Sequence, residues 1–290
     1  MSAPIHTSRR VVLERCPLCG STAWTTLVDT AEFEWVRCAC SAVFKRAEGV
    51  SGAVIDAAGE QAAPDQYDSA YFSLYDRRRR RRVAKSRRQI LDALEVACAG
   101  RFLDVGCSLG YALEAARSLG LDAAGVDVSE HAAETCRRRG FEAHRASLEA
   151  LPFEDASFAV VTLKHVFEHT PQPRTALAEL HRVMIPGAAV LFAVPNVDYF
   201  RGVRRPQTSR FFRGQAARDH FVYYSPQTLA RLLRKEGFVV ASVHPRLLHR
   251  RAGALRWLVE AALVPLRIPL RAAAAALGLR KEFWLVAIRP

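Results

Sequence analysis

The sequence has no run of 18 consecutive apolar residues, so it predicts no membrane-spanning helix. Its first residues lack an apolar signal core, which argues against secretion. It is also poor in cysteine beyond its first 40 residues, where only Cys98, Cys107 and Cys136 of the seven cysteines lie. An odd number with this distribution is not a disulfide framework and favours a reducing compartment. We therefore expect a cytoplasmic protein.

Acidic residues are outnumbered, with 29 Asp plus Glu against 42 Lys plus Arg, and the formal net charge is +13. This excess favours an anionic partner, such as nucleic acid, a phospholipid surface or a phosphorylated substrate. An Arg-rich proteome would give the same balance, and composition does not separate the two explanations. With 290 residues, half of them hydrophobic, the chain can form one α/β domain of ordinary size plus an appendage.

The chain is organised around residues 101–113, RFLDVGCSLGYAL, which predict a strand, a glycine-rich turn and the start of a helix. The next strand ends at Asp127, 21 positions past Gly106, where a carboxylate suits ribose hydroxyls. The pyrophosphate-binding pattern G-x-G-x-x-G fails, because Ser108 and Tyr111 occupy its second and third glycine positions. The pattern therefore favours a nucleoside that carries an amino acid, and the alternative is a βαβ unit whose glycines only allow tight packing.

The four N-terminal cysteines form two close pairs, Cys16-x-x-Cys19 and Cys38-x-Cys40. Two thiolates on one tight turn can face a tetrahedral Zn²⁺, and a second pair closes the site. Four thiolates leave no open position, so such a zinc ion would be structural. The second pair is one residue short of the usual C-x-x-C, and a redox pair or a ribbon without metal stays open.

From residue 101 onward, short apolar strands alternate with helical patterns, which predicts a parallel, doubly wound α/β sheet. The expected strands are 101–105, 122–127, 141–145, 157–163 and 188–194, and the expected helices are 111–118, 130–139 and 173–183. Residues 282–290 predict a final edge strand that pairs with 238–243. The expected domains are a zinc-ribbon-like module (11–46), a linker (47–65), a helical lid (66–99), a core (100–243), a helical cap (244–281) and the final strand (282–290).

Two segments outside the core are rich in arginine. The lid carries six consecutive arginines, Arg77 to Arg82, which predict either a phosphate or nucleic-acid contact or a solvated helix face. Residues 244–281 mix arginine with Leu, Val, Ile and Ala. Such a segment can lie in a membrane interface or pack on the domain as a substrate cap.

Four blocks resemble class I, Rossmann-like S-adenosylmethionine-dependent methyltransferases of the ubiquinone O-methyltransferase type. They are the turn at 101–110, LPFEDASFAVVTLKHVFEH at 151–169, RVMIPGAAVLFAVPN at 182–196 and HFVYYSPQTLARLLRKEGF at 220–238. Ser108 and Ala188 stand where the family usually has glycine. The N-terminal cysteines are similar to a small zinc ribbon found ahead of some methyltransferase domains. The resemblance implies a seven-stranded sheet and S-adenosylmethionine as the cofactor.

The resemblance also implies which residues hold the cofactor. Asp104, Gly106, Ser108 and Gly110 would surround the amino acid and form the turn, and Asp127 would bind the ribose. Leu148 would contact the adenine, and Lys164 or His165 would lie beneath the sulfonium end. The full set is Asp104, Gly106, Cys107, Ser108, Gly110, Asp127, Val128, Ser147, Leu148 and Lys164.

Methyl transfer to a hydroxyl needs a base, and histidine suits that task near neutral pH. We expect His220 as the base, with His165, Glu168 and His169 as further catalytic candidates. Some relatives carry E-x-x-E-H at 165–169 and use a divalent metal there, but here the first acid is His165. Glu168 and His169 could instead only hold their loop by hydrogen bonds.

The sequence thus predicts O-methylation of a small-molecule, sugar or lipid-linked biosynthetic intermediate, with peripheral membrane contact possible. The first alternative is an RNA methyltransferase that uses the ribbon and the Arg-rich helix. The absence of an Asn/Asp-Pro-Pro-Tyr motif argues against it. The second alternative is a scaffold that binds the cofactor without turnover.

Overall fold

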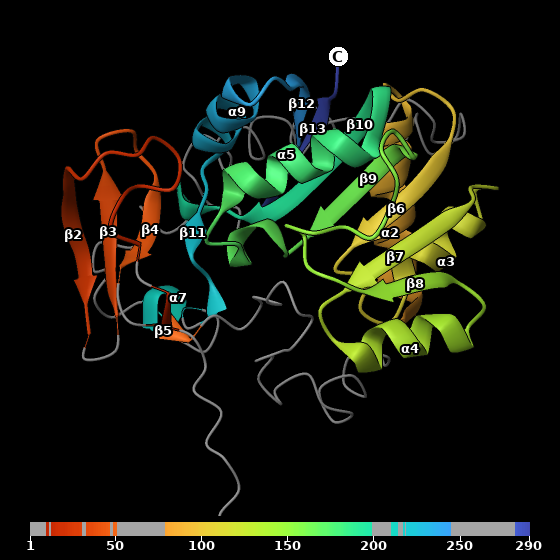
Figure 1. The fold of residues 1–290 in the computed structure, drawn as a ribbon, viewed down its shortest axis with the longest axis horizontal. Helices are drawn as coiled ribbons and strands as arrows, with labels where there is room; N and C mark the ends of the chain where they lie inside the picture. The colour runs from red at the N-terminus through yellow and green to blue at the C-terminus, as the bar shows by residue number, and fades with distance from the viewer. Residues whose placement is uncertain are drawn as a thin grey trace, which may run out of the picture.

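The centre of the protein is a seven-stranded sheet with the strand order β12-β13-β10-β9-β6-β7-β8 (Figure 1). The structure, a computed structural model, describes residues 10–11, 13–30, 33–46, 49–50, 79–198, 210–213, 217, 219–244 and 282–290. Its strands are β6 (Arg101–Val105), β7 (Ala123–Asp127), β8 (Glu142–Arg145), β9 (Phe158–Lys164), β10 (Met184–Pro195), β12 (Val239–His244) and β13 (Glu282–Ile288). β6 to β10 pair in parallel, and β13 runs antiparallel to both of its neighbours. The predicted doubly wound, mostly parallel sheet is confirmed.

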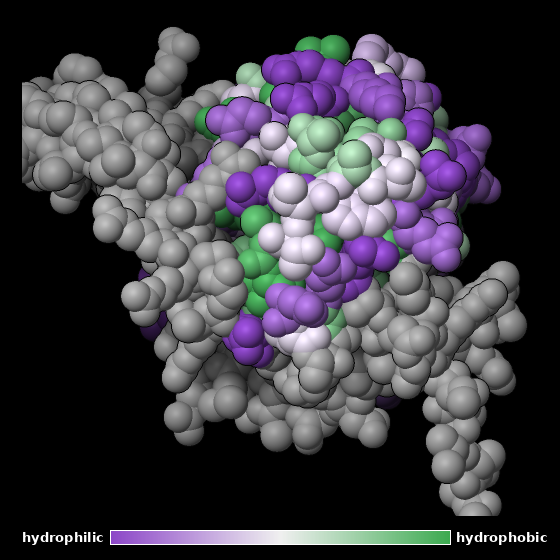
Figure 2. Space-filling view, turned by 90° about the vertical axis from the view of Figure 1, so that its left-hand side faces the viewer, coloured by the Kyte–Doolittle hydropathy of each residue, from purple (hydrophilic) through white to green (hydrophobic). Residues whose placement is uncertain are grey.

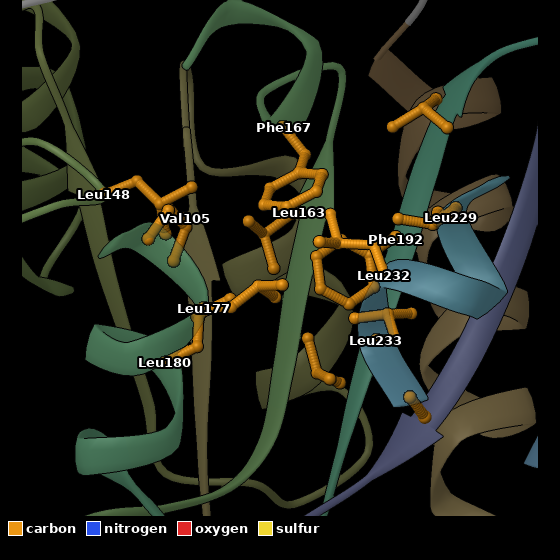
Figure 3. Close-up of a cluster of buried hydrophobic side chains, with 14 of the residues drawn as sticks. Val105, Leu148, Leu163, Phe167, Leu177, Leu180, Phe192, Leu229, Leu232 and Leu233 are labelled. Carbon is orange, nitrogen blue, oxygen red and sulfur yellow. The ribbon is translucent and has the colours of Figure 1, made fainter. Parts of the chain in front are cut away.

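Helices cover both faces of this sheet, because alternate strand residues point to opposite sides. Phe102 and Val160 pack with α2 (Arg79–Leu94), α3 (Tyr111–Arg117) and α4 (Glu130–Arg138) on one face. Leu103 and Val161 belong to the other face, which α5 (Pro173–Val183) and α9 (Pro226–Lys235) cover. Figure 3 shows this second layer, with the leucines of α5 and α9 meeting side chains from β6, β9 and β10.

The last strand does not lie at an edge of the sheet, which corrects the expectation from the sequence. β13 pairs with β12 as expected, but it also pairs along its whole length with β10. Its residues Phe283, Leu285, Val286 and Ala287 are buried, as an interior strand requires. The predicted helical cap lies outside the described residues apart from His244, as do most of the linker and the lid residues 66–78.

The N-terminal segment forms a second, antiparallel sheet of β2 (Trp24–Asp29), β3 (Glu34–Cys38) and β4 (Val43–Arg46). Its fourth strand is β11 (Val222–Tyr223), which comes from the C-terminal half of the chain, and the order is β11-β4-β3-β2 (Figure 1). We call residues 13–46 the ribbon. A short pair, β1 (Arg10–Val11) and β5 (Gly49–Val50), lies beside it in sequence. Viewed from the ribbon side, the described surface mixes hydrophilic residues with a smaller hydrophobic area (Figure 2).

The remaining helices of the described residues are short. The 3-10 helix η2 (Phe167–His169) follows β9, and the helix α7 (Arg210–Arg213) precedes β11. In α2, Arg80, Arg81, Arg87 and Arg88 are exposed. None of the helices in the described ranges is long and apolar enough to cross a membrane.

Candidate active site

The turn between β6 and α3 is built on left-handed backbone. Gly106 has φ +73°, and a Cβ on it would lie 2.3 Å from Val166 Cγ2. Gly110 has φ +74° and directly precedes α3. Ser108, which stands where the methyltransferase motif usually has glycine, has φ +49°. These positions let the backbone approach a ligand at the start of α3, where free N–H groups lie.

Asp104 lies buried beneath this turn. It accepts a hydrogen bond of 2.5 Å from Thr162 Oγ1, and Lys164 Nζ lies 3.5 Å from Asp104 Oδ1. Burial raises the pKa of Asp104, and the charge of Lys164 works against that rise. Lys164 Nζ also donates to Ser86 Oγ of α2 over 3.1 Å. This network joins the helix α2 to the floor of the predicted cofactor site.

Asp127 ends β7 and holds the turn from the side. Its Oδ2 accepts the Ser108 N–H over 2.8 Å, and its Oδ1 accepts the Ser129 N–H over 2.9 Å. Burial raises the pKa of Asp127, and hydrogen bonds from the backbone of Ser129, Ser108 and Val128 work against the rise. A carboxylate offers about four acceptor sites. Asp127 can therefore still accept a hydrogen bond from a ribose hydroxyl.

The remaining predicted cofactor residues do not all face the turn. Val128 is half-buried after Asp127, while Ser147 and Leu148 are buried in the loop after β8. The Cys107 side chain packs away from the turn, with its Sγ 3.7 Å from Cys136 Sγ. Hydrogen bonding to Cys136 and burial raise the pKa of the Cys107 thiol. At position 107, only the backbone is therefore placed for a ligand in the turn.

His165 follows β9 in a left-handed conformation, with φ +57°. Its Nδ1 lies 3.1 Å from Glu168 Oε1 and its Nε2 lies 3.3 Å from Glu282 Oε2. Burial lowers the pKa of His165, but hydrogen bonds to these two carboxylates outweigh it and raise the pKa to about 10. Lys85 of α2 donates to Glu282 over 2.7 Å. Such backbone strain in a fixed network is typical of functional sites.

Glu168, His169 and His220 come together on the other side of this network. Their ligand atoms all lie within 4.8 Å of one another, and the rings of His169 and His220 meet edge to face at 4.6 Å. Glu168 and His220 are buried. Glu168 Oε2 and His220 Nδ1 have no hydrogen-bond partner among the described residues.

The electrostatics of the cluster follow from its burial. Burial, helped by the neighbouring His169, lowers the pKa of His220 to about 3, so its imidazole is neutral. Burial alone would raise the pKa of Glu168, but hydrogen bonding to His165 keeps it below its usual range. A carboxylate beside the neutral imidazole of His220 can accept a proton or bind a divalent cation.

The four ribbon cysteines also converge. Cys16 Sγ lies 3.6 Å from Cys40 Sγ, and Cys19 Sγ lies 3.5 Å from Cys38 Sγ. All four sulfur atoms lie within 4.8 Å of one another. Zn–S bonds of about 2.3 Å in a tetrahedron place sulfur atoms roughly 3.8 Å apart. The arrangement therefore fits a structural zinc ion.

Comparison with known proteins identifies the domain. A sequence model of a methyltransferase domain family matches residues 75–243, more than half of the chain. The chain belongs to this methyltransferase family. A solved S-adenosylmethionine-dependent methyltransferase from Archaeoglobus fulgidus has the same fold, with a TM-score of 0.51, 20% identity and coverage of 75% of this chain and 99% of that one. The predicted family is thus confirmed, and the ribbon lies outside the matched residues.

Two curated relatives cover a smaller part of this methyltransferase. A ubiquinone biosynthesis O-methyltransferase from Aromatoleum aromaticum is 29% identical over 153 residues, which cover 49% of this chain and 65% of the relative. A demethylmenaquinone methyltransferase from Renibacterium salmoninarum is 33% identical over 122 residues, which cover 40% of this chain and 52% of the relative. The chain thus spans about half to two thirds of the length of the curated relatives that it matches.

The candidate site contains residues that were not among the sequence-predicted site residues. Glu282 begins a strand far away in sequence, yet it pairs with His165. Lys85 reaches the same carboxylate from the Arg-rich helix. Buried Tyr224, whose hydroxyl has no partner among the described residues, stacks on Phe167 beside Glu168. In the sequence, Glu282 is marked only as a charged residue at the start of an otherwise apolar strand.

Proposed function

We propose that this protein transfers a methyl group from S-adenosylmethionine to an oxygen of a small-molecule, sugar or lipid-linked biosynthetic intermediate. One observation carries the proposal. The predicted cofactor turn, residues 106–110, contacts the loop of residues 165–169, which carries His165, Glu168 and His169, through Gly106 and Val166. Val166 directly follows His165 and precedes η2. The names of the two quinone-pathway methyltransferases among the relatives support a small-molecule acceptor.

In this proposal the turn binds the cofactor, which supplies an electrophilic methyl group. Asp127 binds the ribose hydroxyls, and the backbone at Gly106 and Ser108 borders the amino-acid part. Asp104 and Lys164 hold the floor beneath the sulfonium end through their ion pair. Since such a donor is already activated, the residues of the chain mainly supply alignment.

The acid–histidine cluster binds and deprotonates the acceptor. His220 Nδ1 takes the proton of the acceptor hydroxyl. The buried carboxylate of Glu168 stabilises the imidazolium that forms, and His165 holds that carboxylate in place. His169 is fixed by the backbone oxygen of Asp219, 3.1 Å from its Nδ1. The lowered pKa keeps His220 neutral but makes it a weak base, so proton transfer to it depends on the Glu168 carboxylate to stabilise the imidazolium.

The same cluster offers a second candidate mechanism, in which Glu168, His169 and His220 hold a divalent cation. The two unpartnered atoms, Glu168 Oε2 and His220 Nδ1, favour this candidate, since buried polar atoms are rarely left unsatisfied. Two imidazoles and one carboxylate suit several divalent metals. Such an ion would lower the pKa of the acceptor hydroxyl, in place of proton transfer to His220.

RNA is the alternative acceptor, and the exposed basic face of α2 supports it. Arg80, Arg81, Arg87 and Arg88 are exposed on one helix, where they could contact phosphates. This helix bonds to Lys164 and Glu282 and does not carry the proposed base, so a small molecule stays the preferred acceptor.

The test is transfer of a labelled methyl group to cell extracts separated into lipid, RNA and small-molecule fractions. Label in the small-molecule or lipid fraction supports the proposal, while label only in RNA reverses the order of acceptors. Cofactor binding without label in any fraction favours a scaffold. Added Mg²⁺, Mn²⁺ or Zn²⁺ after dialysis against a chelator separates the two mechanisms, since only the metal mechanism requires an ion.

A further inference from the structure

The ribbon packs directly on the methyltransferase core. Cys38 and Phe44 of the ribbon share one continuous hydrophobic cluster with Phe221, Tyr224 and the core strands. Trp35, which is fully buried, stacks on Tyr223 with ring centroids 4.4 Å apart. This packing places ribbon side chains next to the segment that carries His220.

That segment, residues 219–224, is held by backbone hydrogen bonds from two sides. On the ribbon side, β4 pairs with Val222 and Tyr223, and Lys45 N–H donates to the Phe221 oxygen over 2.9 Å. On the core side, Phe221 N–H donates to the Glu168 oxygen over 2.8 Å. Phe221 is thus hydrogen-bonded both to Lys45 of the ribbon and to Glu168 of the core, and His220 directly precedes Phe221 in the sequence.

Lys45 strengthens this arrangement with its side chain. The side chain is buried, and Nζ donates to the Ala217 oxygen over 3.3 Å and lies 4.8 Å from the centre of the Phe221 ring. Lys45 therefore contacts the chain on both sides of His220, at positions 217 and 221. Burial lowers the pKa of Lys45 to about 8, although Asp219 works against that shift. Burying a lysine is unfavourable unless its ammonium group makes polar contacts, and the hydrogen bond to the Ala217 oxygen offsets part of this cost.

The cysteine cluster lies directly before β4, the strand that contains Lys45. Cys38 and Cys40 form the turn between β3 and β4, and Cys38 N–H donates to the Ala42 oxygen over 2.9 Å. On its other side this turn is tied to α9, because Arg231 donates to the Cys40 oxygen over 3.0 Å. A metal ion bound to the cysteines would therefore fix the start of β4, two residues before Lys45.

We infer that the ribbon is an integral part of the acceptor site and that Lys45 is a positioning residue, which holds His220 beside Glu168 and His169. The catalytic meaning of this role rests on the proposed function, but the positioning itself does not. The ribbon lies outside the family's matched residues, so the inference adds to the acceptor site a segment that the family model does not cover.

The test compares Lys45→Met, which keeps the length and removes the ammonium group, with Lys235→Met at an exposed position of α9. The readouts are the ring ¹⁵N signals of His220 and His169, assigned with a His220→Gln sample, and exchange of the Phe221 amide. Lys45→Met should shift both rings and speed that exchange about tenfold, as expected for one lost hydrogen bond. Affinity for S-adenosylhomocysteine should stay within a factor of about two, because the turn at Gly106 is untouched.

Unchanged His220 and His169 signals in folded Lys45→Met protein would overturn the inference, as would equal effects of Lys235→Met. If Lys45→Met does not fold, Cys19→Ser gives the same readouts, because it disturbs the ribbon cluster and leaves Glu168, His169 and His220 unchanged. Once an acceptor is known, Lys45→Met should raise its KM or lower kcat, and Lys45→Arg should restore part of the loss. Absent cofactor binding by the wild type would refute the proposed function, while the ring signals would still decide the positioning role.

Discussion

Replacement of Gly106 by alanine probes the cofactor turn most sharply. An alanine at φ +73° meets backbone strain of about 1 to 2 kcal/mol. Its Cβ would also lie 2.3 Å from Val166 Cγ2, and forced repacking of this kind costs about 1 to 3 kcal/mol. We therefore expect Gly106→Ala to lower the free energy of unfolding by about 2 to 5 kcal/mol in urea titrations, and to weaken S-adenosylhomocysteine binding.

Two further variants separate strain from collision. Gly120 has nearly the same φ, +78°, with no atom within 4 Å of an added Cβ, so Gly120→Ala should show only the strain of about 1 to 2 kcal/mol. Val166→Ala removes the colliding methyl group. The double variant Gly106→Ala/Val166→Ala should therefore be more stable than the sum of the single effects by about 1 to 3 kcal/mol. Additive effects, or Gly106→Ala no worse than Gly120→Ala, would refute the contact between turn and loop.

Three other predictions follow from the structure. Because the pKa of His165 rises from 6.5 to about 10 on folding, its stabilisation is complete below pH 6.5 and is lost as the pH rises toward 10. Glu282→Gln should flatten that loss in unfolding measurements, and equal slopes would contradict the pairing. Native mass spectrometry should find one zinc ion per chain that Cys19→Ser removes and Cys98→Ser keeps, and a wild type without zinc would disprove the ribbon site. Arg182 donates to the backbone oxygens of residues 151 and 153. Arg182→Ala should therefore lower the free energy of unfolding by about 1 to 3 kcal/mol. An equal loss in Arg174→Ala would argue that these hydrogen bonds do not stabilise the loop.

Much of the core was predictable because its signals are local. β6 and α5 have the expected bounds, and the other predicted core elements begin or end within a few residues of expectation. The sequence predicts β9 as a strand because five of its seven residues are apolar, as is typical of a strand covered on both faces. The turn was predictable from glycine spacing, since positive φ limits which residues fit.

The rest depends on contacts between distant parts of the chain. The interior place of β13 follows from pairing with β10 across about 90 residues, which no local pattern records. The contact of Glu282 with His165 has the same origin. Cys107 lies in the cofactor motif, but its side chain points toward Cys136, because the turn directs only its backbone outward. The pairing of β11 with β4, which joins the ribbon to the core, likewise could not be predicted from a local sequence pattern.

The central claim is that Asp127 and the turn after β6 bind S-adenosylmethionine. Calorimetric titration with S-adenosylhomocysteine tests it most directly, on wild-type protein, Asp127→Ala and the exposed control Asp122→Ala. Loss of charge-assisted hydrogen bonds to the ribose should weaken binding to Asp127→Ala at least about a hundredfold, with Asp122→Ala equal to wild type. Wild-type affinity in a folded Asp127→Ala protein, or no heat of binding in the wild type, would contradict the claim.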